Sequence, residues 1–265
     1  MTGNTVDTSG KDGILVGNGG SGTTNPAKAN IISGNSVTRS GQSGMRLNGA
    51  PAGIDYLKFM YPGIIGMSIL FSAIFGAMSI VWDREFGFLK EVLVAPIDRW
   101  AVAIGKALGG TTQAMIQGLI LLVLAPFIGV KLSLLTVVEL IPLAAVLAFG
   151  LASFGVAIAS MMKSLQGFQV VMNFLMMPMF FLSGALFPLT NLPAWMTVLT
   201  RADPASYGID PIRRVVLANS GLPHVDSLGL TINGQVLPIL LEAGIMLGFG
   251  VVLLAVAVVM FQRRD

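Results

Sequence analysis

The chain of 265 residues has no cysteine, a single histidine and few charged residues. Without cysteine there is no disulfide, no thiolate nucleophile and no cysteine-ligated zinc. His224 is not accompanied by the G-x-S-x-G turn of a serine hydrolase. The P-loop pattern G-x-x-x-x-G-K-[ST] is also missing, because Gly105-Lys106 is followed by Ala107. We therefore expect a chain that is not an enzyme and has no nucleotide-hydrolysing site of its own.

Charge is scarce as well. Charged residues make up 11% of the chain, against about 25% in an average soluble domain, while hydrophobic residues make up 54%. The mean hydropathy is +0.80. The net charge is only +3 and the basic residues are scattered, so nucleic acid is not an expected partner. This composition predicts an integral membrane protein.

Five apolar runs are long enough to cross a hydrocarbon core, which takes about 20 helical residues. They cover residues 61–81, 104–130, 134–161, 168–187 and 236–261. Backbone groups in lipid must be bonded within the protein, and these runs are too long for barrel strands, so the predicted fold is all-α and polytopic. Residues 56–265 form the predicted transmembrane domain. Residues 1–55 are rich in Gly, Ser, Thr and Asn and are predicted to be a disordered tail.

Lysine and arginine near the span ends predict the orientation. Basic residues gather in the link between the first two spans and at the C-terminus, which are therefore expected to be cytoplasmic, in the cell (inner) membrane. With five spans, the N-terminal tail is then expected outside.

The link 82–99 (WDREFGFLKEVLVAPIDR) is the densest charged segment. Its charges alternate in sign, and Phe86 begins a set of four apolar residues that falls close to one face of a helix ending at Pro96. We expect a short amphipathic helix at the membrane surface. It is either a solvated connector or a docking element for a cytoplasmic partner, since charges of both signs suit an interface of fixed register.

The loop before the last span contains the segments FFLSGALFP and DPASYGIDPIRRVVL. Gly184 and Pro188 are expected to end the fourth span early, and Trp195 suits an interfacial anchor. The segment after Pro211 is expected to form an amphipathic helix on the outer surface. Simple capping of the helix bundle is the alternative.

Polar side chains within the spans are few. Gln113 and Gln117, at i and i+4 on the second span, and Asn173 on the fourth are candidates for a substrate pathway. The glutamines are equally suited to bonding neighbouring helices. Glu139 and Glu242 lie near span ends, where a glutamate is expected to reach the interface.

Three of these features together resemble the membrane subunits of type-2 ABC exporters, and among them the daunorubicin-resistance type of permease. They are the first span with the residues before it, the run DREFGFLKEVLVAP, and FLSGALFP followed by LPAW and DPASYGID. The resemblance covers about residues 55–265. Its two motifs occur in the family's order and spacing.

The resemblance implies a role for each motif. The cytoplasmic motif is a coupling helix that docks into a separate ATPase, made here of Asp83, Arg84, Glu85, Gly87, Lys90, Glu91 and Pro96. Phe88 departs from the threonine that relatives commonly have. The outer motif is a gate of short re-entrant helices, made here of Gly184, Pro188, Pro193, Trp195, Asp203, Pro204, Tyr207 and Asp210.

The implied function is that of a permease subunit in an ATP-driven exporter, moving a lipophilic or amphiphilic molecule such as a drug, antibiotic or lipid-like compound out of the cell. A second permease copy, giving a homodimer, and a separate ATPase are the implied partners. ATP and magnesium are bound by the ATPase, and no cofactor or metal by this chain. An ion-coupled secondary transporter and a non-transporting membrane scaffold are the alternatives.

The family normally has six spans. The first is not visible in residues 1–55, so we expect the tail to replace that span or to occupy the place of the first outer loop.

Overall fold

The computed structural model describes residues 56–87, 98–130, 132–186, 189, 192–218, 229–232 and 235–263. The chain divides into two compact units, Met1–Tyr56 and Leu57–Asp265. Apart from Tyr56, all of the described residues belong to the second unit. The predicted tail 1–55 lies outside the described residues.

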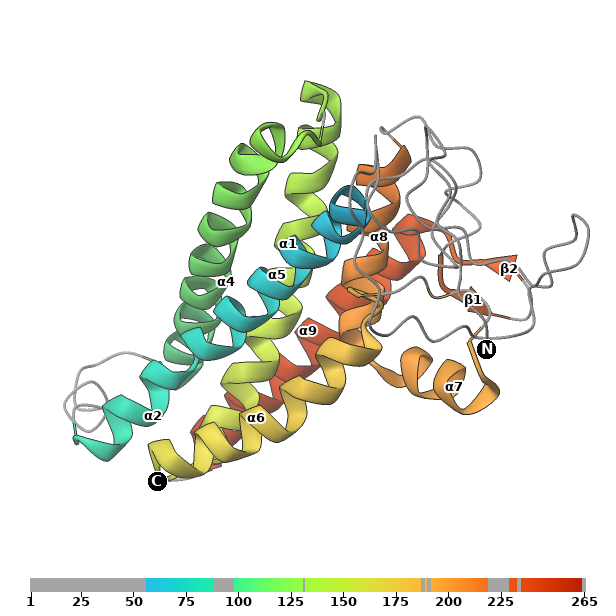
Figure 1. The fold of residues 1–265 in the computed structure, drawn as a ribbon. Helices are drawn as coiled ribbons and strands as arrows, with labels where there is room; N and C mark the ends of the chain where they lie inside the picture. Colours follow the sequence, from blue (N-terminus) through green and yellow to red (C-terminus); the bar gives the residue numbers. More distant parts are fainter. Residues whose placement is uncertain are drawn as a thin grey trace, which may run out of the picture. The chain divides into compact units, whose positions relative to one another are not determined.

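Helices dominate the described part of the chain (Figure 1). In order they are α1 (Tyr56–Gly76), α2 (Met78–Glu85), α4 (Arg99–Leu124), the 3-10 helix η1 (Ala125–Ile128), α5 (Leu134–Met161), α6 (Leu165–Leu182), α7 (Ala194–Ala202), α8 (Pro204–Ala218) and α9 (Ile239–Arg263). Two short strands, β1 (Thr231–Ile232) and β2 (Gln235–Val236), pair antiparallel ahead of α9.

Among the described residues, five segments are helical, long and apolar enough to cross a membrane, which confirms the predicted all-helical polytopic fold. They are Met60–Glu85, Trp100–Ile128, Leu134–Met161, Leu165–Leu182 and Ile239–Gln262. α1 and α2 are separated by Ala77 alone and together make the first span.

Several predicted span ends need correction. The second span begins at Trp100 and not at 104, and the fourth begins at Leu165 and not at 168. The first span continues as a helix to Glu85, because the helical backbone extends beyond the last apolar residues into the charged segment. The fourth ends at Leu182 and not at 187, and the predicted early end at Gly184 is confirmed, since that glycine follows in the left-handed region with φ +75°. The fifth begins at Ile239, because residues 235–236 pair as strand β2.

Helix α5 is the centre of the bundle and packs against α9, α4, α8 and α2. Its contact faces are lined by small residues, and a Cβ added to Gly250 of α9 would lie 2.9 Å from Cα of Gly150. Lipid is as apolar as a leucine side chain, so association between spans depends on such close backbone packing. Small residues in α5 therefore let its neighbours approach closely.

Serine side chains cap the N-termini of α5 and α6. The hydroxyl of Ser133 accepts from the backbone N–H of Thr136 at 3.2 Å, and that of Ser164 accepts from Gly167 at 3.2 Å. Each bond satisfies one of the free donors at a helix N-terminus.

Candidate functional site

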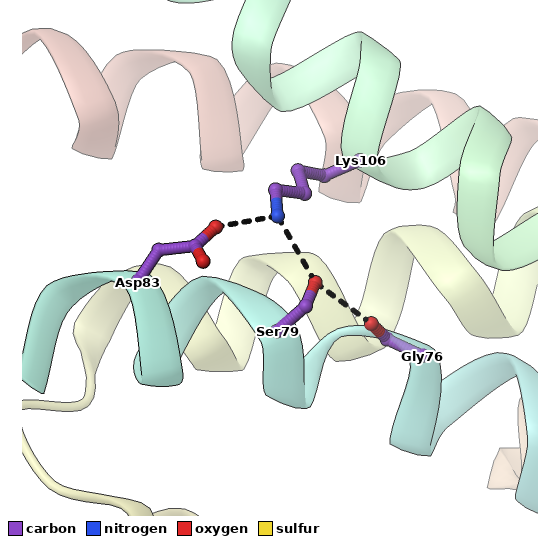
Figure 2. A network of polar contacts seen from close by, with 4 residues as sticks. All are labelled: Gly76, Ser79, Asp83 and Lys106. Carbon is purple, nitrogen blue, oxygen red and sulfur yellow. Dashed lines mark hydrogen bonds and ion pairs between the residues drawn. The ribbon is translucent and has the colours of Figure 1, made fainter. Parts of the chain in front are cut away.

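The charged end of α2 is tied to α4 by a small polar network (Figure 2). Lys106 extends from α4 and places its Nζ 2.6 Å from Oδ2 of Asp83 and 3.2 Å from Oγ of Ser79. The Ser79 hydroxyl in turn donates to the carbonyl of Gly76 at 3.2 Å. The Lys106 and Asp83 side chains are 30% and 24% exposed, so solvent screens the pair and it is worth about 0–1 kcal/mol. Its main effect is to fix the position of α2 against α4.

Arg84, the next residue, binds the C-terminus of α5. Its Nη1 donates to the carbonyls of Ala159, Ser160 and Met162 at 3.5, 3.1 and 2.5 Å. The last carbonyls of a helix have no partner within the helix, and they carry its negative partial charge. A guanidinium at this place satisfies those acceptors and interacts favourably with the helix dipole.

Glu85 binds the start of the following helix. Its Oε2 accepts from the backbone N–H of Leu165, the first residue of α6, at 2.8 Å. A carboxylate at a helix N-terminus satisfies an unpaired donor and interacts favourably with the positive end of the dipole. Arg84 and Glu85 thus hold both ends of the connection between α5 and α6.

Three consecutive residues therefore join α2 to three other helices. We call Asp83, Arg84, Glu85 and Lys106 the α2 bracket. The predicted separate amphipathic helix over 82–99 needs correction at its start, because Trp82–Glu85 continue the first span. Gly87 follows with φ +82°, and the side chain of Phe86 is 77% exposed. Lys90, Glu91 and Pro96 lie outside the described residues.

A second charged cluster is buried where α8 meets α9. Arg214 Nη2 lies 2.7 Å from Oε1 of Glu242, and Arg214 Nε lies 3.2 Å from Oδ2 of Asp210. The three side chains are at most 5% exposed. Arg214 also donates to the carbonyl of Leu237 at 2.8 Å, and Asp210 accepts from the N–H of Leu230 at 3.0 Å. This buried triad therefore ties α8 to α9 and to the segment that precedes α9.

Two sequence predictions are wrong here. The segment after Pro211 does not lie on a surface, because Pro211 is inside α8 and that helix is buried over most of its length. Glu242 does not reach the interface, because it is fully buried and paired with Arg214. Arg214 lies four residues after Asp210 and also contacts Glu242 of α9, so the three charges can be buried together as pairs.

Asp203 begins the turn between α7 and α8. Its carboxylate accepts from the N–H of Ala205 at 3.0 Å and from the hydroxyl of Ser206 at 3.4 Å, and Pro204 is the first residue of α8. Burial raises the pKa of Asp203 to about 7, against these two hydrogen bonds, which lower it. Burial also raises the pKa of Asp210, with Arg214 acting in the opposite direction. The hydroxyl of Tyr207 donates to the carbonyl of Arg201 at 2.7 Å.

The other predicted gate residues lie around α7. Pro193 precedes this helix as its N-cap, and Trp195 is 66% exposed in its first turn. Gly184 terminates the fourth span, and a Cβ there would meet the side chain of Leu189 at 2.6 Å. Pro188 lies outside the described residues. Trp195 therefore remains available as an interfacial anchor.

The three substrate-pathway candidates do not converge in this chain. Gln113 and Gln117 are exposed on α4, and Asn173 is exposed on α6. Of these, Gln113 lies near the first span, with its Oε1 3.5 Å from the place that a Cβ on Gly76 would take. Within the described ranges, no three His, Asp or Glu side chains gather as a set of metal ligands.

Sequence reasoning missed Lys106, Arg214 and the pairing of Glu242. Lys106 is 23 residues from Asp83 and on another helix, so no local pattern links the two. Asp210 and Arg214 do have an i, i+4 spacing that predicts a pair on one helix. That spacing was the available signal for the buried triad.

The fold and these clusters define a polytopic helical membrane protein whose polar contacts lie between helices. The sequence matches the family described as "ABC-2 type transporter" over residues 29–217. This is more than half of the chain, and the chain belongs to that family. The match starts within the segment for which we predicted a disordered tail.

Curated relatives carry permease names. The chain is 30% identical to the transport permease ycf38 of Cyanophora paradoxa over 164 residues, covering 60% of this chain and 56% of that protein. It is 29% identical to YbhR of Escherichia coli, named as a multidrug ABC transporter permease, over 65% of this chain and 47% of YbhR. It is 26% identical to the inner membrane transport permease YadH of E. coli, over 68% and 70% of the two chains. The chain thus spans about half the length of ycf38 and YbhR.

Proposed function

We propose that the chain is the permease subunit of an ATP-driven exporter and works with a separate ABC ATPase. Membership of the ABC-2 type transporter family supports the transport role. The relatives named as permeases, one of them a multidrug permease, support export of a lipophilic or amphiphilic substrate. In this proposal ATP and magnesium are bound by the ATPase, and this chain supplies the membrane path.

The α2 bracket is the observation that carries the proposed coupling. The link 88–97 follows α2 directly and is the proposed contact with the ATPase. When ATP binding closes the ATPase, a push on that link moves the end of α2. Asp83, Arg84 and Glu85 then transmit the movement to α4, α5 and α6, because each is bonded to one of these helices.

The buried triad is the proposed brace of the opposite end. It holds α8 against α9, so α8 follows the spans when they rock and the outer gate opens or closes with them. The substrate path is proposed to form between two copies of the chain, lined in part by Gln113, Gln117 and Asn173. The C-terminus is cytoplasmic and the membrane is the cell (inner) membrane in this arrangement.

Copurification followed by transport tests the proposal. The chain, expressed in its native host with an affinity tag, is expected to retain an ABC ATPase through purification. Vesicles containing both proteins are expected to accumulate an amphiphilic dye only with ATP. Collapse of the proton gradient with ATP present should leave uptake unchanged. Uptake that stops with the gradient supports a secondary transporter instead, and a chain that binds no ATPase contradicts the proposal.

A further inference from the structure

A pocket of about 380 Å³ opens between the first turns of α5, the last turns of α8 and the start of α9. Leu135 of α5, Val215 of α8 and Ile239 of α9 provide apolar walls, and the carboxylate of Glu139 lies on the lining. This volume is within the range of small-molecule sites, which are typically about 300–1,000 Å³ and mostly apolar with few polar groups.

Glu139 is the one charged lining group that is not already paired within the described ranges. Arg214 also lines the pocket, but its guanidinium is bound by Asp210, Glu242 and the carbonyl of Leu237. The lining hydroxyls of Ser133 and Thr136 are bonded to each other at 2.8 Å. None of the described residues gives the exposed carboxylate of Glu139 a hydrogen bond or an ion pair.

The charge balance of the pocket is negative. Beside the pocket, the buried Arg213 and Arg214 balance the two buried carboxylates of Asp210 and Glu242. Among the described residues, the carboxylate of Glu139 is therefore the uncompensated charge of the pocket, which favours a cation and disfavours an anion.

Depth in the membrane restricts the ligand further. Glu139 is five residues beyond Leu134 at the start of α5, or about 7.5 Å along the helix. It lies at the opposite end of α5 from the carbonyls that Arg84 binds. Interfacial amphipathic segments bury their apolar face about 5–10 Å into the boundary between headgroups and acyl chains, so Glu139 lies at interfacial depth. An unpaired carboxylate at this depth is costly in lipid, and an ammonium group compensates it.

We propose that this pocket binds the ammonium group of an amphiphilic amine at Glu139, with the apolar part of the ligand along Leu135, Val215 and Ile239. The ammonium donates a charge-assisted hydrogen bond to the carboxylate, which is stronger than a bond between neutral groups. Ligand binding at this site does not require the ATPase, so it can be tested independently of the proposed transport function.

The test is equilibrium binding to the full chain in phosphatidylcholine nanodiscs, with empty nanodiscs as background. Three probes share one alkyl chain: decylamine, decanol and decanoate. Decylamine is expected to bind at least tenfold more tightly than decanoate. Glu139→Gln is expected to remove at least tenfold of the decylamine affinity and to leave decanol binding unchanged. Asp98→Asn, which removes an exposed carboxylate outside the pocket, should change neither.

A second variant keeps the carboxylate in place. Leu135→Arg puts a guanidinium four residues before Glu139 on the pocket wall, so it should pair with Glu139 and exclude the amine. Leu134→Arg is the matched control, because Leu134 is also strongly exposed but does not line the pocket. Both leucines are 69–83% exposed, so neither change disturbs the core. Equal decylamine binding by wild type and Glu139→Gln, or by Leu135→Arg and Leu134→Arg, would overturn the proposal.

The same binding measured in phosphatidylethanolamine nanodiscs identifies the source of the amine. If the lipid headgroup occupies the site, decylamine binds more weakly there than in phosphatidylcholine, and Glu139→Gln abolishes that difference. If the affinity is equal in the two lipids, the site takes free amphiphilic amines. Either result supports an amine site, whereas a lipid effect that persists in Glu139→Gln contradicts it.

Discussion

Replacing Arg214 by methionine should destabilise the fold strongly, because it removes the cation that pairs with buried Glu242 and one of the two arginines that act on buried Asp210. Arg214 Nη2 and Glu242 Oε1 are 2.7 Å apart, Arg214 Nε and Asp210 Oδ2 are 3.2 Å apart, and both carboxylates are fully buried. Methionine fills a similar volume, so the change tests charge more than packing. The bond from Arg214 to the carbonyl of Leu237 is also lost.

Removing one partner of a buried pair costs roughly 3–5 kcal/mol. For 150–250 residues, 1 kcal/mol shifts the melting temperature by about 2–4 °C, which predicts a decrease of roughly 6–20 °C. Asp83→Asn is the matched control, because it breaks a partly exposed pair worth about 0–1 kcal/mol and should lower the melting temperature by at most about 4 °C.

The assay is thermal unfolding of the purified chain in one detergent, followed by circular dichroism at matched protein and lipid content. The double variant Arg214→Met, Glu242→Gln removes both partners of the 2.7 Å pair and leaves Asp210 as the counter-charge of the fully buried Arg213, so it should melt closer to wild type than Arg214→Met alone. A melting temperature of Arg214→Met within about 2 °C of wild type would refute this reasoning. So would a double variant that melts as low as the single one.

Two further predictions concern Asp203 and the glycines. The pKa of Asp203 is raised to about 7 in the folded chain, so the folded state binds more protons than the unfolded state between about pH 4 and 7. Stability should therefore fall as pH rises through that window, and Asp203→Asn should flatten the melting-temperature profile; a parallel profile in the variant contradicts the assigned cause. Gly63→Ala should lower the melting temperature because its Cβ would lie 2.0 Å from the backbone oxygen of Ala185, whereas Gly105→Ala, with nothing within 4 Å, should be neutral or stabilising by up to about 1 kcal/mol. Equal effects of the two alanines in the same unfolding assay would show that the contact at Gly63 is not tight.

The number and order of the spans could be predicted because each is a continuous apolar run, and hydropathy is a direct consequence of burial in lipid. The ends could be predicted only in part, because they depend on local backbone chemistry. The early end of the fourth span was predicted from Gly184, which adopts φ +75°. The pairing of residues 235–236 with residues 231–232 delays the last helix.

Most of the polar contacts between helices could not be predicted from the sequence. Asp83, Arg84 and Glu85 were recognised from the charged motif, but their partners on α4, α5 and α6 are 23 to 80 residues away. Glu242 reads as an interfacial residue because its neighbours in sequence are apolar, and only the tertiary position of Arg214 buries it as a pair. In such cases local sequence identifies a charge and the packing decides what it binds.

The ratio of substrate moved to ATP hydrolysed in vesicles holding the chain and its ATPase tests the central claim most directly. Glu85→Lys reverses the charge that holds the N-terminus of α6, whereas the control Glu85→Gln keeps a side-chain oxygen that can accept from the N–H of Leu165. We expect Glu85→Lys to continue to hydrolyse ATP but to move little substrate, while Glu85→Gln keeps most of the wild-type ratio. A wild-type ratio in Glu85→Lys would contradict the account.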